Sequence, residues 1–571
     1  MAASGAVGNG TTDDTAAINT FFAGLTNGTT VYLPAGKFYL INSANLVVPA
    51  GIAIVGSGSP LPQNVSGQPT GSGFILNPSY TVLLSDGDTL ADLGVWRSGL
   101  TVNPTAAQVL AAVSQWGSEN SVGITVPPNL GRDLIDNVFV EGFNRGLLLQ
   151  SGQVTVRDLW GDDYDGLYVD YYPGDRSTFS GIRFEPFYAF GTASTSGSWA
   201  RPGIAFWLAG TNGGGDLSGL FSFMYANSLV VAGEGWNITN GWFEWDDSAG
   251  NGETNAIGIR AIGNGSTNIS SVQSSSDFPV SAEAGGQTTF RDVATSQSNS
   301  SNPDWFLGGQ ATSETFTVGG TAAAGNQLSA TFTSASVSGS PVTVSYTETA
   351  ADGTSTAAHA LARAINQTQS LAAAHISAVG TSTGSVVTVY ADDSVSVTYS
   401  AAASGSATLT AASGAGLGGT GGLIAGARQD GIAGSPVFKL TNNVQWWTIA
   451  HPYFQKPLPT GWISDAGAGS GTLTLSGVPW STVTTSNLSG CGTSPNMSPG
   501  ANDGDGTVTE GTTATGCTMT FTTPFFKAPD CTLSSPTGTL PTGYSTTTTA
   551  LVITNASGSN DEFIYHCRPN G

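Results

Sequence analysis

Carboxylates, tryptophans and one arginine recur in one part of the chain at spacings that could place them on a common surface. The set comprises Trp96, Trp160, Asp162, Asp163, Tyr164, Arg183, Glu185, Trp242, Glu244 and Trp245. Aromatic faces can stack on the apolar side of sugar rings, while carboxylates and arginine bind the hydroxyls. Two carboxylates can also supply the acid and the nucleophile or base that cleave a glycosidic bond. These residue types predict a carbohydrate site, provided that the fold brings them together.

A short pattern repeats from about residue 90 to residue 300: a strand, a bend, a second strand and a glycine. Examples are "LIDNVFVEGF", "FSGIRFEPFY" and "ITNGWFEWDDS", usually followed by another strand such as "GLLLQSG". The repeats begin about 20 to 40 residues apart, with strands and no helices expected between them, which predicts a solenoid of stacked coils. Adjacent coils of such a solenoid pair in parallel, about 4.8 Å apart.

The repeats can be aligned on one anchor residue per coil. The anchors are Asp92, Asp136, Asp158, Gly181, Gly219, Asn240, Ser271 and Asp292. Because side chains alternate along a strand, residues one and three past the anchor should face one way and those at two and four the other. The first set is apolar: Leu93, Val95, Phe139, Leu159, Ile182, Phe184, Leu220 and Phe243. The second set should therefore face outward: Trp96, Trp160, Asp162, Arg183, Glu185, Phe221, Phe223, Trp242 and Glu244.

Three of the outward carboxylates are the candidate catalytic residues. Asp162 and Glu185 lie on adjacent coils, about 5 Å apart at the backbone, and Glu244 lies about two coils beyond Glu185. The apolar stretch "RFEPFY" around Glu185 favours a protonated carboxyl and hence a general acid. The polar stretch "WGDDYDG" favours an ionised Asp162 that acts as nucleophile or base. Trp160 and Trp242 would hold sugars on either side.

Other interpretations of these residues stay open. Outward tryptophans can be buried in a trimer interface, and Arg183 can form a structural ion pair with a neighbouring carboxylate. Asp162, Asp163 and Asp165 could bind a cation, but their spacing is not that of an EF-hand loop, and no metal or cofactor is expected. A polysaccharide lyase could use Arg183 and Tyr164, although an acid-rich surface suits a polyanion poorly.

The start of the chain, "GNGTTDDTAAINTFFAGLTNGTTVYLPAGKFYL", predicts one short helix followed by strands. Ile18, Phe21, Phe22 and Leu25 form an apolar stripe at helical spacing. This stretch resembles the entrance of the pectate-lyase-like right-handed parallel β-helix proteins, which include bacteriophage tailspikes. The resemblance covers residues 5–310 and implies that the helix closes the open end of the solenoid. It is specific for the fold and not for a reaction.

The predicted fold is all-β, with four parts. Residues 1–310 form the β-helix with its capping helix, and residues 311–425 an inserted β-rich module with a helix along Ala358, Leu361, Ala362 and Ile365. Residues 426–465 return to the β-helix or form a neck, and residues 466–571 form a C-terminal β-sandwich for trimerisation or receptor binding. The four cysteines, all after residue 490, could form two disulfides in three possible pairings or remain thiols.

Composition excludes some classes of function. The 16 Lys and Arg residues against 39 Asp and Glu give a net charge of −23, so nucleic acid is not an expected partner. The chain has no apolar run of membrane-spanning length, and no secretory signal is visible. The resemblance places the start of the β-helix almost at Met1, where tailspikes usually carry a virion-attachment domain. We therefore expect the chain to be a fragment or to attach through an adaptor protein.

These observations predict a homotrimeric tailspike in the virion tail that binds and hydrolyses a bacterial surface polysaccharide, capsule or O-antigen. The alternatives are a tail fibre or adhesin that binds the polysaccharide without cleaving it, and a polysaccharide lyase.

Overall fold

The structure of the protein is a computed structural model. It describes residues 5–58, 71–128, 130–170, 176–193, 197–209, 214–246, 255–262, 266–283, 287–297, 302–308, 310–349, 352–380, 384–392, 395–414, 421–429, 436–441, 446–450, 452–454, 463–465, 472–476, 485–498, 501–522, 525, 528–536, 541–554 and 561–568.

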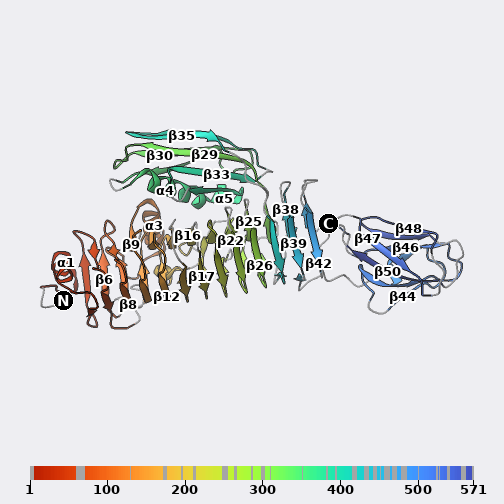
Figure 1. The fold of residues 1–571 in the computed structure, drawn as a ribbon, viewed down its shortest axis with the longest axis horizontal. Coiled ribbons are helices and arrows are strands. Elements are labelled where there is room, and N and C mark those ends of the chain that lie inside the picture. Colours follow the sequence, from red (N-terminus) through yellow and green to blue (C-terminus); the bar gives the residue numbers. More distant parts are fainter. Residues whose placement is uncertain are drawn as a thin grey trace.

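The described strands of the solenoid form two parallel sheets that run along its length (Figure 1). Sheet A has 23 described strands: β1 (Asn9–Asp13), β2 (Thr30–Tyr32), β3 (Phe38–Ile41), β5 (Ala53–Val55), β6 (Gly73–Leu76), β8 (Thr89–Arg97), β10 (Leu134–Glu141), β12 (Thr155–Asp162), β14 (Ser177–Ser180), β15 (Arg183–Phe184), β17 (Gly215–Ser218), β18 (Phe221–Phe223), β20 (Trp236–Thr239), β21 (Trp242–Glu244), β23 (Thr267–Ser270), β24 (Gln273–Ser276), β26 (Gln287–Arg291), β27 (Ala294–Gln297), β36 (Gly421–Ala425), β37 (Arg428–Gln429), β39 (Trp446–Ala450), β40 (Tyr453–Phe454) and β42 (Thr472–Ser476).

Sheet B has 12 described strands: β4 (Leu46–Val47), β7 (Val82–Leu83), β9 (Val122–Val126), β11 (Arg145–Leu149), β13 (Asp165–Val169), β16 (Arg201–Leu208), β19 (Tyr225–Val231), β22 (Ile257–Ala261), β25 (Phe278–Ala282), β28 (Trp305–Leu307), β38 (Phe438–Leu440) and β41 (Ile463–Asp465). In a typical coil the chain runs along sheet A, bends, continues in sheet A and returns through sheet B. The predicted right-handed parallel β-helix is confirmed.

Each coil bends in sheet A at one residue with a left-handed backbone. The residues are Asp92, Asn137, Asp158, Gly181, Gly219, Asn240, Ser271 and Asp292, with φ between 49° and 69°. Seven of the eight predicted anchors are these residues. The anchor at Asp136 is wrong by one position, because Asn137 takes the left-handed conformation (φ 51°) that Asn tolerates well.

The interior of the solenoid is one continuous apolar core. Seven of the eight predicted inward residues are buried in it: Leu93, Val95, Leu159, Ile182, Phe184, Leu220 and Phe243. The eighth, Phe139, lies in a separate apolar cluster with Trp96 and Phe187. At the N-terminal end, helix α1 (Thr15–Ala23) buries Ile18 and Phe22 against this core. The predicted capping role of the helix is confirmed, since burying its stripe removes the exposed end of the core from water.

Two helical segments interrupt the solenoid where only strands were expected. Helix α3 (Ala106–Ser118) lies between β8 and β9 and begins with a capping box formed by Thr105 and Gln108. The short helix η2 (Phe187–Ala189) follows β15. The ring of Trp116 from α3 lies 5.6 Å from that of Tyr188 in η2, so the two segments pack on each other.

The inserted module consists of two antiparallel sheets and two helices beside the solenoid (Figure 1). Its described elements are β29 (Gln310–Gly320), β30 (Gln327–Thr333), β31 (Val342–Thr347), α4 (Thr354–Gln367), α5 (Gln369–Ala373), β32 (Ile376–Gly380), β33 (Val386–Asp392), β34 (Thr398–Ala403) and β35 (Ala407–Ser413). The predicted stripe of α4 is buried in the core of the module. The solenoid resumes at β36, which pairs with β26, so it begins again a few residues before the expected boundary at residue 425.

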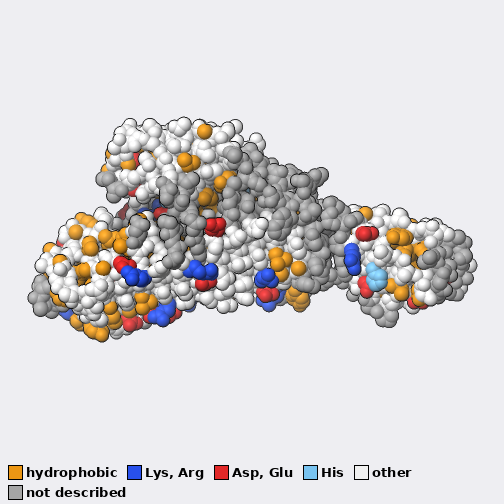
Figure 2. Space-filling model, in the orientation of Figure 1, with side chains coloured by type: hydrophobic (Ala, Val, Ile, Leu, Met, Phe, Trp, Pro, Cys, Tyr) orange, Lys and Arg blue, Asp and Glu red, His pale blue; other side chains and the backbone are white. Residues whose placement is uncertain are grey.

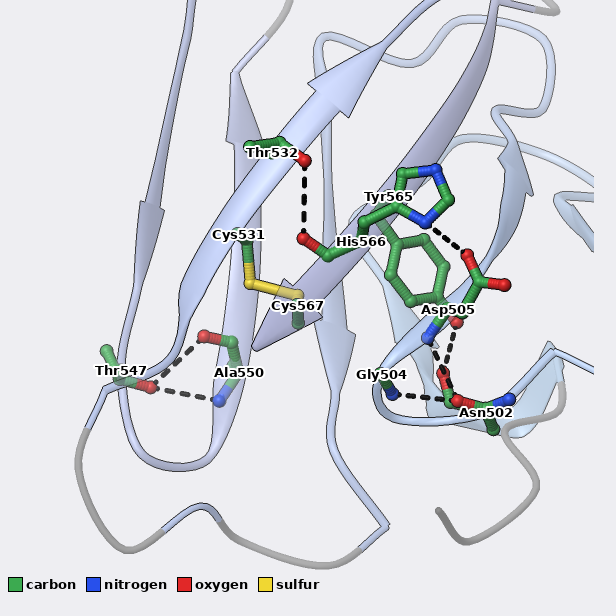
Figure 3. The surroundings of a disulfide bond; sticks show 10 residues. All are labelled: Asn502, Gly504, Asp505, Cys531, Thr532, Thr547, Ala550, Tyr565, His566 and Cys567. Atoms are coloured by element: carbon green, nitrogen blue, oxygen red, sulfur yellow. Dashed lines mark hydrogen bonds and ion pairs between the residues drawn. A yellow bond between two sulfur atoms is a disulfide. The ribbon is translucent and has the colours of Figure 1, made fainter. Parts of the chain in front are cut away.

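The C-terminal part forms two small antiparallel sheets at the far end of the solenoid (Figure 1). Its described strands are β43 (Leu488–Ser489), β44 (Asn496–Met497), β45 (Asp505–Thr509), β46 (Gly516–Thr520), β47 (Asp530–Ser534), β48 (Gly543–Thr546), β49 (Ala550–Thr554) and β50 (Glu562–Arg568). The four cysteines form the disulfides Cys491–Cys517 and Cys531–Cys567. The second disulfide joins the paired strands β47 and β50, and the carbonyl oxygen of Asn502 accepts a hydrogen bond from the buried Tyr565 beside it (Figure 3).

Candidate functional site

The parallel register of sheet A places the predicted site residues in two rows after the bend. Residues two past the bend are neighbours from coil to coil and form the aromatic ladder: Trp160, Arg183, Phe221 and Trp242. Residues four past the bend form the carboxylate row: Glu141, Asp162, Glu185 and Glu244, with Phe223 between the last two. The register therefore brings the three predicted catalytic carboxylates into one line.

The aromatic ladder is a continuous set of contacts on the outer surface. Trp160 and Trp242 are 40% and 47% exposed. The guanidinium of Arg183 lies between two rings, 5.4 Å from the centroid of Trp160 and 4.7 Å from that of Phe221. Phe221 meets Trp242 edge to face at 5.8 Å. Exposed aromatic faces on this scale are suited to stacking against an apolar surface such as a sugar ring.

Glu185 lies beside the ladder and is almost fully buried. Its Oε1 accepts a hydrogen bond from Nε of Arg183, and the two groups form an ion pair. This is the structural ion pair that the sequence left open for Arg183. Burial raises the pKa of Glu185; the Arg183 guanidinium lowers it in part, and the charge of Asp162 raises it further. A carboxyl in this environment keeps its proton to a higher pH than an exposed glutamate.

Asp162 differs sharply from the expected polar and accessible carboxylate. It is fully buried, and its two oxygens accept hydrogen bonds from Nε and Nη2 of the equally buried Arg201 at 2.6 and 2.8 Å. The backbone N–H of Tyr188 adds a third hydrogen bond at 2.7 Å. The expectation of an accessible setting is wrong because Tyr188 and Arg201, from the chain after β15, bind both oxygens and leave Asp162 no exposed surface.

Glu141 is a member of the carboxylate row that the sequence analysis missed. It lies between Trp96 and Asp162 in the register and is fully buried. Burial raises the pKa of Tyr188, and the charge of Glu141 raises it further. Burial lowers the pKa of Arg201, but Asp162 above all, with a smaller contribution from Glu141, raises it. Choosing Asn137 as the anchor would have found it, because Glu141 is the fourth residue past that bend.

Several predicted binding residues are buried and have structural roles here. Trp96 has no exposed surface, because the rings of Phe38 and Phe139 pack against it at 5.4 and 6.4 Å. Phe139, which was predicted to face inward, therefore lies on the outer side of the strand. Trp245 is 2% exposed, in a small apolar cluster. The prediction that Trp96 and Trp245 contact sugar is therefore wrong for this conformation.

Two further predicted residues lie beneath the surface. Asp163 is fully buried and accepts a hydrogen bond from the backbone N–H of Phe143 at 2.8 Å. Tyr164 is half-buried and packs against the cluster that α3 forms with η2. Asp163 therefore stabilises the coil corner, and burial raises its pKa well above the usual value.

A row of aromatic rings after β15 extends the site beyond what the repeat predicts. Phe187 stacks parallel to Trp160 at 6.3 Å and contacts Phe190 at 5.2 Å. Trp199 contacts Phe190 at 5.5 Å and Phe223 at 6.0 Å. The rings run from the ladder, past Glu185, to the carboxylate row. They lie in an irregular insertion, so strand periodicity does not reveal them.

An open pocket of about 430 Å³ adjoins the ladder at its Trp242 end. Its lining includes Trp242, Gln273, Asp292 and Arg428. Glu244 lies half-buried next to Trp242, and burial followed by the charge of Asp246 raises its pKa. An exposed tryptophan beside amide, carboxylate and guanidinium groups is a suitable surface for a polar ring with one apolar face.

On the face drawn in Figure 2, charged side chains are sparse and acidic and basic groups often lie together. Exposed pairs such as Arg157–Asp136 and Arg176–Asp216 account for several basic groups of the solenoid. Within the described part of the chain, no cluster of three or more His, Cys, Asp or Glu residues could hold a metal ion. No described helix is long and apolar enough to cross a membrane.

A family model described as rhamnogalacturonase A/epimerase, pectate lyase-like, matches residues 2–98. The match confirms, for these first coils, the resemblance to the pectate-lyase-like β-helix proteins. The comparison with curated proteins found no match.

Three solved structures are similar to this chain at low sequence identity. The Dettilon tailspike protein (gp208) has a TM-score of 0.35 and 10% identity, with 98% of this chain and 92% of that chain covered. The catalytic unit of a GH87 α-1,3-glucanase from Streptomyces thermodiastaticus has a TM-score of 0.25 and 14% identity, with 52% and 62% covered. The A-module of the mannuronan C-5 epimerase AlgE6 from Azotobacter vinelandii has a TM-score of 0.28 and 12% identity, with 84% and 98% covered. At these scores, the three similarities indicate nothing about the function of this chain.

Proposed function

We propose that the protein is a tailspike-type depolymerase that binds a bacterial surface polysaccharide along the aromatic ladder and hydrolyses its glycosidic bonds. The observation that carries this proposal is the exposed aromatic ladder beside Glu185. Successive residues of the ladder lie one coil apart. Exposed tryptophans in a line, next to carboxyl groups with raised pKa values, are what a glycoside hydrolase needs and what folding does not require.

Glu185 is the general acid in this proposal. It donates its proton to the leaving glycosidic oxygen, and the upward shift of its pKa, caused mainly by burial, supports that role. Because Asp162 is bound by Arg201, we assign the base to Glu244, which takes a proton from the attacking water. The two carboxylates stand two coils apart, about 9.6 Å at the backbone. That spacing is near the upper end for an inverting pair, roughly 6.5–9.5 Å between carboxyl groups.

A second candidate function is binding without cleavage, as in a tail fibre or adhesin. The observation that favours it is that ion pairs hold two of the three predicted catalytic carboxylates, Asp162 with Arg201 and Glu185 with Arg183. In a pure adhesin these pairs would remain intact while sugars stack on Trp160 and Trp242.

Incubation with a panel of purified bacterial capsules and O-antigens tests the proposal. A hydrolase releases new reducing ends, which Glu185→Gln should slow by about 10²-fold or more. Unsaturated products that absorb in the near ultraviolet would instead identify a lyase. Binding with unchanged chain length would identify an adhesin.

We also propose that the protein assembles as a homotrimer in a virion tail and is attached there through an adaptor protein. Tailspikes of this fold class supply the analogy, and the two C-terminal sheets, at the far end of the solenoid (Figure 1), would form the oligomer. Light scattering at micromolar concentration checks this: three times the chain mass is expected, and a monomeric mass would contradict it.

A further inference from the structure

The guanidinium of Arg183 is held differently from the other exposed arginines of the solenoid. Its Nε donates to Glu185, and both of its faces are covered, by the rings of Trp160 and Phe221. Its side chain is nevertheless 41% exposed. Among the described residues, Nη1 and Nη2 of Arg183 have no hydrogen-bond partner. The outer edge of the guanidinium is therefore fixed in place and presented to solvent.

Two other exposed arginines of the solenoid, Arg157 and Arg176, use the terminal nitrogen Nη2 within the protein. Nη2 of Arg157 donates to Asp136 at 2.6 Å, and Arg176 donates through both Nε and Nη2 to Asp216 at 3.2 and 2.7 Å. These arginines neutralise an aspartate on a neighbouring coil. Arg183 instead binds its carboxylate through Nε, from the side, which leaves the two terminal nitrogens parallel and accessible.

We propose that Arg183 is a specificity-determining residue that binds the carboxylate of an acidic sugar, such as a uronate, in the polysaccharide. This inference rests on the proposed function and narrows its substrate class. Two parallel N–H donors match the two oxygens of a carboxylate, and a guanidinium that is already ordered loses little freedom when it binds. Neighbouring sugars would stack on Trp160 on one side and on Trp242 on the other.

The charges around Arg183 permit an anion in spite of the chain's net charge. Asp162 is neutralised by Arg201 and has no exposed surface. The carboxylate nearest to Arg183 is Glu185, and a substrate carboxylate would compete with it for the same guanidinium. The two negative charges repel, so binding of the acidic sugar and protonation of Glu185 favour each other. In this way the substrate would promote the acid form of the residue that cleaves it.

The test uses one polymer in two forms. Polygalacturonate and alginate are each compared with their carboxyl-reduced counterparts, which keep the ring and linkage but lose the charge. Affinity is measured for the parent protein, Arg183→Gln, Glu185→Gln and Arg157→Gln, the last being a matched loss of an exposed arginine outside the ladder. A thermal unfolding scan of each variant confirms that it is folded.

The parent protein should bind at least one acidic polymer at least about tenfold more tightly than its reduced form. Arg183→Gln should abolish that preference with little effect on the reduced polymer, whereas Arg157→Gln should change neither. Glu185→Gln should bind the acidic polymer more tightly than the parent does, because it removes the competing charge.

Equal affinity for the two forms, or an equal loss for both in Arg183→Gln, would overturn the inference while leaving the proposed function intact. Failure of the proposed function has a different signature. In that case Trp242→Ala would bind every polymer tested, acidic or reduced, as tightly as the parent protein does. That result would overturn both the proposed function and this inference.

Discussion

Two faces of the same solenoid carry tryptophan and arginine side chains, which are buried on one face and exposed on the other. On sheet B, the helices of the inserted module lie over the coils around β16, β22 and β25 (Figure 1), where Ala372 of α5 packs with Ile257 and Phe278. Nε2 of Gln367 in α4 donates to both oxygens of Asp165 at 2.8 and 2.6 Å, and Nη2 of Arg260 donates to the carbonyl of Ile376 at 2.6 Å. On sheet A, the aromatic ladder remains open to solvent.

The buried face shows what structural use of these residue types looks like. Arg260 and Glu283 form a buried ion pair at 2.8 Å, and the ring of His375 stacks on Phe306 with centroids 3.3 Å apart. Trp207 is 1% exposed. Rings and charged groups on this face are covered, and several of them contact the inserted module. We call this contact between sheet B and the inserted module the junction. The exposed tryptophans and the outward guanidinium edge of sheet A have no such cover, which is why we assign function to that face.

The largest expected effect is on stability at the covered face. Arg260→Met removes the cation and leaves Glu283 buried beneath the module. We expect a loss of about 3–5 kcal/mol in unfolding free energy, because a buried charge that loses its partner is costly. Denaturant titration measures it. Arg157→Met, which breaks an exposed pair, should cost about 1 kcal/mol or less; equal costs for the two variants would contradict the distinction between the faces.

The same junction should respond to acid. Burial raises the pKa of Glu283, but Arg260 and His375 outweigh that effect and hold the pKa at about 2. A folded-state pKa below the unfolded value contributes stability above about pH 4.5, and this contribution is lost as the pH falls toward 2. Unfolding titrations between pH 5 and pH 2 should show it. If Arg260→Met loses stability with falling pH in the same way as the parent protein, the Glu283–Arg260 pair is not the cause of this pH dependence.

On the open face, the largest effect should be on turnover. Glu185→Gln preserves shape and removes the acid, so hydrolysis should fall by about 10²-fold or more with binding retained. Reducing-end assays measure it. Because the carboxyl is not part of the module junction, the denaturation midpoint should shift far less than in Arg260→Met. Parent-level turnover would remove Glu185 from the mechanism.

Two tryptophan variants, one on each face, test the difference between the open and the covered face. Trp242→Ala should weaken polysaccharide binding by about tenfold and leave stability nearly unchanged. Trp207→Ala, at the ring that stacks on Tyr168 under the module, should lower stability by about 3–5 kcal/mol and leave the affinity of the folded protein intact. Affinity and unfolding measurements on both proteins are needed. The opposite pattern would assign the binding surface to sheet B.

The sequence predicts the regular part of this molecule well. Bends, inward residues and the line of Asp162, Glu185 and Glu244 all follow from a two-residue alternation that stacking repeats in every coil. One misplaced anchor, Asp136 for Asn137, was enough to hide Glu141 and to reverse Phe139, because a one-residue slip exchanges the two faces of a strand.

What the sequence could not predict lies in segments without a period. Helix α3 and the rings of Phe190 and Trp199 belong to insertions between strands, and they decide which residues of the carboxylate row reach the surface. The burial of Asp162 depends on Arg201, which lies 39 residues later in the chain. The sequence pattern gives the row of residues, while exposure within the row depends on these tertiary contacts.

The most direct test of the account is a crystal structure of the Glu185→Gln protein with an oligosaccharide produced by its own parent enzyme. We expect sugar rings stacked on Trp160 and Trp242, with a glycosidic oxygen within hydrogen-bonding distance of residue 185. Oligosaccharide bound only on the inserted module or on the C-terminal sandwich, with the ladder empty, would contradict it.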